Sequence, residues 1–251
     1  MTMSIARLFR MGFQILFRDP AVIVPYLSFF ILHLIAGEWL VMPTLGPLGQ
    51  IGSSDILILS VSWVAETGIK LLTTGLALRY IFRRLWVDFP ELKERLPVLE
   101  VRRLPILMLR KFPAIVAASA LVLLPLFASV QGLSQVQSSP LSWVTGVYLL
   151  IGIMAIPLGV VLEFLPAILL VEDCGLFSGL IRSTQFVKQH LKACLLYFAL
   201  VFSVMLAGSI LGLLLGSGEY VGSGLLVAVS QGVTYALVYL ITPIFYLLLR
   251  S

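Results

Sequence analysis

Three ionisable residues stand inside long apolar stretches of the sequence. Glu66 and Lys70 are four residues apart within residues 56–80, and Glu163 lies within residues 141–171. Residues four apart share one face of an α-helix, so the first two charges could meet. A charge at the centre of a bilayer costs roughly 2.5–3.5 kcal/mol and is usually paired or functional. This buried charge cluster could therefore form an ion, proton or substrate path, or it could simply clamp helices together.

No other combination of residue types points to catalysis. Histidine, cysteine and acidic residues nowhere cluster at metal-ligand spacing, and neither a Walker A sequence nor G-x-G-x-x-G occurs. Gly222-Ser223-Gly224 lacks the G-x-S-x-G frame of a nucleophile elbow. We therefore expect no enzyme activity, no catalytic residue, no metal and no cofactor.

Composition places the chain in a membrane. Of its 251 residues, 60% are hydrophobic and 12% are charged, against about 45–50% and about 25% in soluble domains. Six continuous apolar segments are long enough to cross a hydrocarbon core of roughly 30 Å as helices. They span about 21–41, 56–80, 114–130, 141–171, 194–215 and 225–249. Barrel strands would instead alternate in polarity over about ten residues. The sequence predicts an all-α, polytopic membrane protein, with residues 1–251 forming one six-helix bundle.

The basic residues predict an orientation. All 17 lysines and arginines except Lys70 fall on one side of the six predicted spans, and the loops 42–55, 131–140 and 216–224 contain none. The positive-inside rule places the basic side in the cytoplasm. We therefore expect both termini to be cytoplasmic and the chain to lie in the cell inner (plasma) membrane. No nucleic-acid partner is expected.

Amphipathic segments lie on the predicted cytoplasmic side. Residues 4–18 and 175–192 each carry a polar and an apolar stripe at helical spacing, which is typical of helices in the membrane interface. Similar junctions, Arg18-Asp19-Pro20-Ala21 and Lys111-Phe112-Pro113-Ala114, precede the first and third spans. Proline is favoured in the first turn of a helix, so each junction predicts a helix start.

Two further sets of residues are candidate contact sites. Seven basic residues between the second and third spans could bind anionic lipid headgroups, although they could equally serve only as topology signals: Arg79, Arg83, Arg84, Arg102, Arg103, Arg110 and Lys111. Three glycines at four-residue spacing, Gly208, Gly212 and Gly216, form a smooth helix face. We expect this face to pack against another helix of the same chain, with a homodimer or a membrane-protein partner as the alternative.

Depth links the charged residues. At 1.5 Å per residue, Lys70 lies roughly 14 Å from Arg79, and Glu163 lies roughly 12 Å from Val171, both measured towards the cytoplasmic side. The two spans also run in the same direction. The sequence therefore predicts that these spans are neighbours and that Lys70 is shared between Glu66 and Glu163.

Two segments of the sequence resemble segments of a known group of proteins. Residues 171–188 read VEDCGLFSGLIRSTQFVK, and residues 18–25 read RDPAVIVP. Both are similar to segments of the YciC-like six-helix prokaryotic membrane proteins, which include the membrane domain of some glycerophosphodiester phosphodiesterases. Gly179 departs from the alanine common in that group. The resemblance implies a six-helix bundle with interfacial helices and no activity, because the hydrolase chemistry belongs to a separate soluble domain.

Two classes of function remain open. The favoured one is a non-enzymatic membrane component, either a scaffold or accessory subunit of a membrane complex or a bundle that organises lipid. The alternative is a small transporter or channel that uses Glu66, Lys70 and Glu163. Pro157, Pro166 and Pro243 could support the alternative by kinking the spans. A water-filled cavity around the charges would favour transport, and a dry contact would favour a scaffold.

Overall fold

The computed structural model describes residues 5–39, 53–88, 101–135, 143–216 and 223–250. Every element within these ranges is helical, and no strand occurs among them. The elements in chain order are α1 (Ile5–Arg18), η1 (Pro20–Val22), α2 (Val24–Trp39), α3 (Ser53–Asp88), η3 (Val101–Arg103), α4 (Leu104–Gln135), α5 (Trp143–Val171), α6 (Leu176–Gln189), α7 (Leu191–Gly216) and α8 (Ser223–Leu249). The predicted all-α class is confirmed for this part of the chain.

Several of these helices are suited to a membrane. Within the described residues, three segments are long and apolar enough to cross one, namely Leu104–Leu121, Leu191–Leu211 and Gly224–Leu249. A fourth arises if the pair Leu8–Arg18 and Pro20–Leu32, bent by 99°, is counted as one span. The described part of α5 adds a shorter apolar segment, Pro157–Val171. Length and composition therefore support three or four spans directly.

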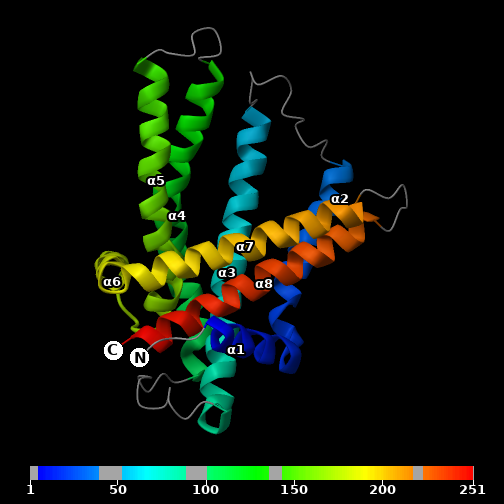
Figure 1. Ribbon diagram of the computed structural model, residues 1–251, viewed down its shortest axis with the longest axis vertical. Helices are drawn as coiled ribbons and strands as arrows, with labels where there is room; N and C mark the ends of the chain where they lie inside the picture. Colours follow the sequence, from blue (N-terminus) through cyan, green and yellow to red (C-terminus); the bar gives the residue numbers. More distant parts are fainter. Residues whose placement is uncertain (1–4, 40–52, 89–100, 136–142, 217–222, 251) are drawn as a thin grey trace.

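The helices do not all run in one direction. In Figure 1 the α4–α5 hairpin and α3 follow the long axis of the molecule, whereas the α7–α8 hairpin crosses them. Helix α8 contacts α1, α2, α3, α5 and α7. Its apolar segment is 67% buried, against 17% for that of α7. Helix α8 is therefore the central packing element, and α7 covers its outer side.

The two proline junctions behave differently. Asp19 and Pro20 separate α1 from α2 at a sharp bend. Pro113, by contrast, lies inside α4, which begins at Leu104 rather than near Ala114. The prediction of a helix start at the second junction is therefore wrong. A proline removes one backbone hydrogen bond, and packing along the α4–α5 hairpin can outweigh that loss.

The two predicted amphipathic segments are helices, α1 and α6. The apolar face of α1 packs on α8, and Leu8, Met11 and Ile15 are fully buried. The opposite face is mixed, because Phe13 and Phe17 are exposed beside Arg10. Helix α6 likewise exposes Phe177 and Ile181 beside Arg182 and Lys188. Each helix therefore has one face in the protein core and a surface face that combines apolar and basic residues.

Two aromatic clusters pack around the middle of α8. Phe164, Phe186, Tyr197 and Phe245 join α5, α6, α7 and α8. Tyr26 of α2 stacks on Tyr239 of α8, with ring centroids 5.3 Å apart. Aromatic contacts of this kind add roughly 0.5–1.5 kcal/mol each beyond the area they bury. They fix the relative positions of the helices that carry the buried charges.

Candidate functional site

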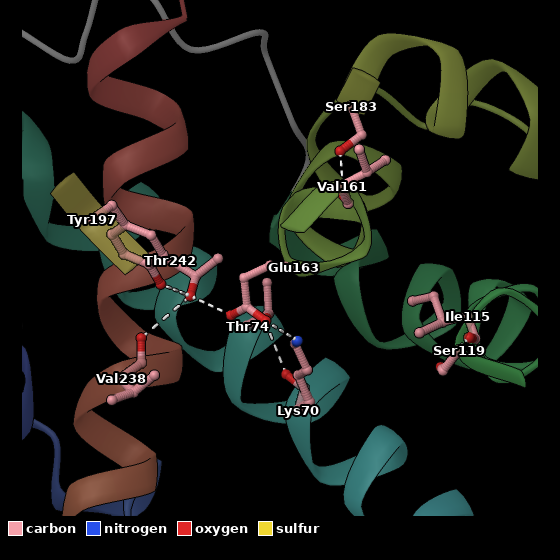
Figure 2. A network of polar contacts seen from close by, with 10 residues as sticks. All are labelled: Lys70, Thr74, Ile115, Ser119, Val161, Glu163, Ser183, Tyr197, Val238 and Thr242. Atoms are coloured by element: carbon pink, nitrogen blue, oxygen red, sulfur yellow. Dashed lines mark hydrogen bonds and ion pairs between the residues drawn. The ribbon is translucent and has the colours of Figure 1, made fainter. Parts of the chain in front are cut away.

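Helices α3 and α5 bring two of the predicted charges together. Lys70 Nζ lies 2.5 Å from Glu163 Oε2, in both a hydrogen bond and an ion pair (Figure 2). The two side chains are only 18% and 14% exposed. The predicted proximity of the second and fourth apolar segments is therefore confirmed at this contact.

Hydroxyl groups hold the other oxygen of Glu163. Thr242 Oγ1 of α8 donates to Glu163 Oε1 at 3.1 Å, and the Tyr197 hydroxyl of α7 lies 2.5 Å from Thr242 Oγ1 (Figure 2). Thr242 Oγ1 also lies 3.2 Å from the Val238 carbonyl. Four helices, α3, α5, α7 and α8, thus contribute to one hydrogen-bonded chain.

The ammonium of Lys70 has an aromatic neighbour as well. Its Nζ lies 4.7 Å from the centre of the Tyr239 ring of α8. A cation over an aromatic face is stabilised by the ring quadrupole, most strongly where water is excluded. Lys70 is therefore held from two sides, by the carboxylate of Glu163 and by the ring.

A pocket of about 190 Å³ opens beside this ion pair. Helices α3, α4, α5 and α8 line it. Its charged and polar lining comprises Glu66, Thr67, Lys70, Ser119, Glu163 and Tyr239, and the remainder comprises Trp63, Ile115, Gly159, Leu162 and Pro166. A volume of this size accommodates several water molecules. The three predicted charges therefore line one pocket and are not enclosed in a fully packed contact.

Glu66 occupies this pocket without an ion pair. Among the described residues its carboxylate forms no hydrogen bond and has no cation within 4.0 Å. The predicted sharing of Lys70 is therefore confirmed as an ion pair for Glu163 alone, and Lys70 acts on Glu66 through its charge without a direct ion pair among the described residues. Glu163 binds Lys70 in preference because Thr242 orients its carboxylate towards α3.

A second charged cluster lies at the C-terminal end of α5. Glu172 accepts hydrogen bonds from the Tyr246 hydroxyl, at 2.5 Å, and from Arg182 of α6. Arg250 lies 3.5 Å from the same carboxylate. Burial alone would raise the pKa of Glu172, but the hydrogen bonds from Tyr246 and Arg182 and the positive charges of Arg250 and Arg182 hold it below the ordinary value. We call Glu172 and these three partners the junction cluster.

Lys111 and Asp173 form an adjacent pair. Lys111 Nζ lies 2.8 Å from an Asp173 carboxylate oxygen and donates to the Cys174 carbonyl at 2.7 Å. The hydrogen bond from Lys111 lowers the pKa of Asp173. Asp173 has a positive φ of 41°, a conformation that side chains of its type tolerate better than most. The pair ties the start of α4 to the α5–α6 turn.

The seven basic residues of the candidate lipid-contact set differ in how far their side chains are exposed. Five of its members, Arg79, Arg83, Arg102, Arg103 and Arg110, have exposed side chains. Lys111 is only 6% exposed and binds Asp173, so its charge is not presented to a lipid surface. The side chain of Arg84 lies outside the described residues.

The structure describes the surroundings of one of the three glycines on the predicted packing face, Gly208. A Cβ atom at this position would lie 2.5 Å from Thr234 Oγ1 of α8, so the two helices approach closely there. The contact is within the chain, as expected for this residue. Gly212 and Gly216 fall outside the residues whose surroundings are described.

The hydroxyl groups of α8 were not among the residues predicted from the sequence. Tyr235, Tyr239, Thr242 and Tyr246 follow one another at spacings of four, three and four residues, which places them on one helix face. Such a polar stripe in an apolar span could have identified them. Within the described residues, no group of three or more histidine, cysteine or acidic side chains could hold a metal.

Comparison with known proteins adds no identification. No protein-family model, curated protein or solved structure matches the chain. The resemblance to the YciC-like group therefore stays a prediction that rests on residues 18–25 and 171–188.

Proposed function

We propose that the chain is a multi-pass protein of the cell inner (plasma) membrane with six spans and both termini in the cytoplasm. The three or four apolar helices of the described residues support this, as does the one-sided distribution of basic residues. The crossing of the two hairpins in Figure 1 would then require α4–α5 and α7–α8 to tilt in opposite directions.

Cysteine labelling tests this arrangement. Single cysteines placed in 42–55, 131–140 and 216–224, in a chain without Cys174 and Cys194, should react with a thiol reagent that cannot cross the inner membrane. Cysteines at positions 95 and 185 should react only after the membrane is opened. Labelling of position 95 or 185 in sealed cells, with none in the three loops, would reverse the orientation.

We further propose that the chain is a small transporter or channel that moves a polar solute through the pocket between α3, α4, α5 and α8. One observation carries this proposal, namely that Glu66, Lys70 and Glu163 line a cavity. Ionisable groups at membrane depth are costly and mark substrate or ion paths when they face a cavity. Pro157 and Pro166 in α5 and Pro243 in α8 each remove a backbone hydrogen bond within a continuous helix, and prolines are frequent in the helices around transporter sites.

Uptake into proteoliposomes tests this function. The panel comprises small labelled organic cations, carboxylates and uncharged polyols, and vesicles without protein set the background. We expect uptake of at least one class. The double variant Lys70→Met with Glu163→Gln, which removes the ion pair without stranding a charge, should abolish it. A background level of uptake for every class by folded protein would overturn the proposal.

A second candidate is a scaffold or accessory subunit that organises anionic lipid. The exposed side chains of Arg79, Arg83, Arg102, Arg103 and Arg110 favour it, since each basic group near an anionic leaflet contributes about 1 kcal/mol. Replacing these five by glutamine should reduce the anionic lipid that co-purifies. Unchanged lipid content would remove this support, and a stoichiometric protein partner in mild detergent would favour the subunit form.

A further inference from the structure

The charges that line the pocket do not balance. Lys70 is held by Glu163 at 2.5 Å, while Glu66 faces the same cavity without an ion pair among the described residues. Two acids and one base leave one net negative charge when all three are ionised. A partly buried carboxyl that has no ion pair of its own is stabilised by keeping its proton. The charge balance of the pocket therefore favours a neutral Glu66.

Within the described ranges, no other group near Glu66 supplies the missing positive charge. Lys70 on the same helix is already paired with Glu163 on α5, so its charge stabilises the Glu66 carboxylate only in part. The remaining titratable groups that face Glu66 are the phenols of Tyr26 on α2 and of Tyr235 and Tyr239 on α8. Phenols are uncharged near neutral pH. A positive charge that enters the pocket would therefore be the natural partner of the Glu66 carboxylate.

The walls of the pocket suit an organic cation. Trp63 and Tyr239 both line it, and Tyr239 already carries the ammonium of Lys70 on its face at 4.7 Å. Aromatic faces attract ammonium groups, and tryptophan does so most strongly. The pocket offers fewer favourable contacts to an anion, because the Lys70 ammonium is paired with Glu163 and the Ser119 hydroxyl donates to the Ile115 carbonyl at 2.5 Å. A volume of about 190 Å³ limits the ligand to a small molecule.

We propose that the pocket takes a small organic monocation in exchange for the proton of Glu66. The O–H bond of the Glu66 carboxyl breaks, the proton passes to water, and the carboxylate left behind pairs with the cation. No other bond changes, and the pocket is neutral before and after the exchange. This inference rests on the proposed transport function and names the substrate class of the same pocket.

Calorimetry on the purified protein tests the exchange, with choline and tetramethylammonium as probes. Titration in two buffers of different ionisation enthalpy counts the protons released. Choline should release about one proton and should bind more weakly as the pH falls, since protons compete for Glu66. The uncharged carbon isostere of choline should bind at least about tenfold more weakly, because it cannot pair with the carboxylate.

Variants separate charge from shape. Glu66→Gln should lose both choline binding and proton release, while Glu66→Asp, which keeps the acid, should retain both in weakened form. Ser203→Ala removes an exposed hydroxyl of α7 that lies outside the pocket lining, and it should behave as the parent. Thermal unfolding of each variant establishes that it is folded.

Three results would overturn the inference: choline binding without proton release, equal binding of the isostere, or full binding by Glu66→Gln. Absence of choline binding together with vesicle uptake of anions or polyols would also overturn it, and the proposed transport function would stand. Absence of both binding and all uptake would overturn the two together.

Discussion

Glu163 of α5 and Glu172, the residue that follows the helix, are two carboxylates nine residues apart that the fold treats in opposite ways. Glu163 and Glu172 are almost equally buried, with side chains 14% and 11% exposed. Glu172 meets two arginines and a tyrosine hydroxyl. Glu163 meets one lysine and a threonine hydroxyl, and a second acid, Glu66, lines the cavity beside it. Burial therefore does not separate the two sites, whereas the balance of neighbouring charge does.

That difference gives different roles to the pocket-lining part of α5 and to the turn that follows the helix. The junction cluster has an excess of base and no unpaired acid among its members, so it closes the α5–α6 turn against the end of α8. The pocket has an excess of acid and free volume. A site that has a carboxylate without an ion pair and free volume beside it is suited to binding a ligand. A site whose carboxylate is already paired with cations is suited to holding helices together.

The largest expected effect on stability comes from leaving the Glu163 carboxylate without its cation. Lys70→Met removes the cation from Glu163 and should destabilise the protein by roughly 3 kcal/mol, because breaking a buried pair leaves an uncompensated charge. Adding Glu163→Gln should recover most of that loss, since the double change leaves no charge behind. Thermal unfolding in detergent measures both. A double variant less stable than Lys70→Met would contradict the pairing.

A somewhat smaller effect is expected at the junction cluster. Glu172→Gln should cost about 1.5–3 kcal/mol at neutral pH, the usual value of hydrogen bonds to a charged group. The folded state lowers the pKa of Glu172 below its ordinary 4.5. Its stabilisation is therefore present above pH 4.5 and is lost as the pH falls through the lower, folded-state pKa.

Unfolding as a function of pH checks the sign of this effect. The difference in stability between the parent and Glu172→Gln should shrink as the solution becomes more acidic than pH 4.5. A difference that stays constant, or grows in acid, would show that Glu172 gains nothing from its cationic neighbours in the folded protein.

Helix α7 packs on α8, which contributes Tyr239 to the pocket. Gly208→Ala would place a methyl group 2.5 Å from Thr234 Oγ1 and should destabilise by about 1–2 kcal/mol through overpacking. Gly146→Ala is the matched control, because nothing lies within 4 Å of the added atom. It should be neutral or gain up to about 1 kcal/mol from helix propensity. Equal stability of the two variants would show that α7 packs loosely at Gly208.

The smallest effect separates two tyrosines. Tyr246 binds Glu172 directly, whereas Tyr197 reaches Glu163 only through Thr242. Tyr246→Phe should cost about 1.5 kcal/mol and Tyr197→Phe about 0.5–1 kcal/mol, since bonds to charged groups are the stronger ones. Thermal unfolding of both variants gives the order. The reverse order would mean that the phenol of Tyr197 contributes more than its single contact with Thr242.

The sequence predicted the helices because continuous apolar runs have one solution in lipid. It also predicted the Lys70–Glu163 contact, because both residues lie at similar depth in spans of the same direction. The predicted sharing of Lys70 holds as an ion pair for Glu163 alone among the described residues. Helical spacing showed that Glu66 and Lys70 share a face, but it could not show that a hydroxyl from α8 would orient Glu163 towards Lys70 first.

In the sequence, the segment that holds Glu172 and Arg182 of the junction cluster was singled out only by its resemblance to the YciC-like group. Residues 171–188 hold Glu172, Asp173, Gly179 and Arg182, and each has a structural reason that spacing alone does not reveal. Arg182 folds back onto Glu172, and Asp173 receives Lys111 from another helix. A Cβ atom at Gly179 would lie 2.6 Å from Leu169 Cδ2, so α6 approaches α5 closely there. These contacts depend on a turn whose path no local pattern fixes.

Water access to the pocket tests the central claim most directly. Ser119→Cys points a thiol at the cavity, and Ala118→Cys places one at a neighbouring position that is only 1% exposed. In a chain without Cys174 and Cys194, a water-soluble methanethiosulfonate reagent should modify position 119 rapidly and position 118 slowly or not at all. Equally slow reaction at both positions in folded protein would show that the charges of α3 and α5 meet in a dry core, and the transport proposal would fall.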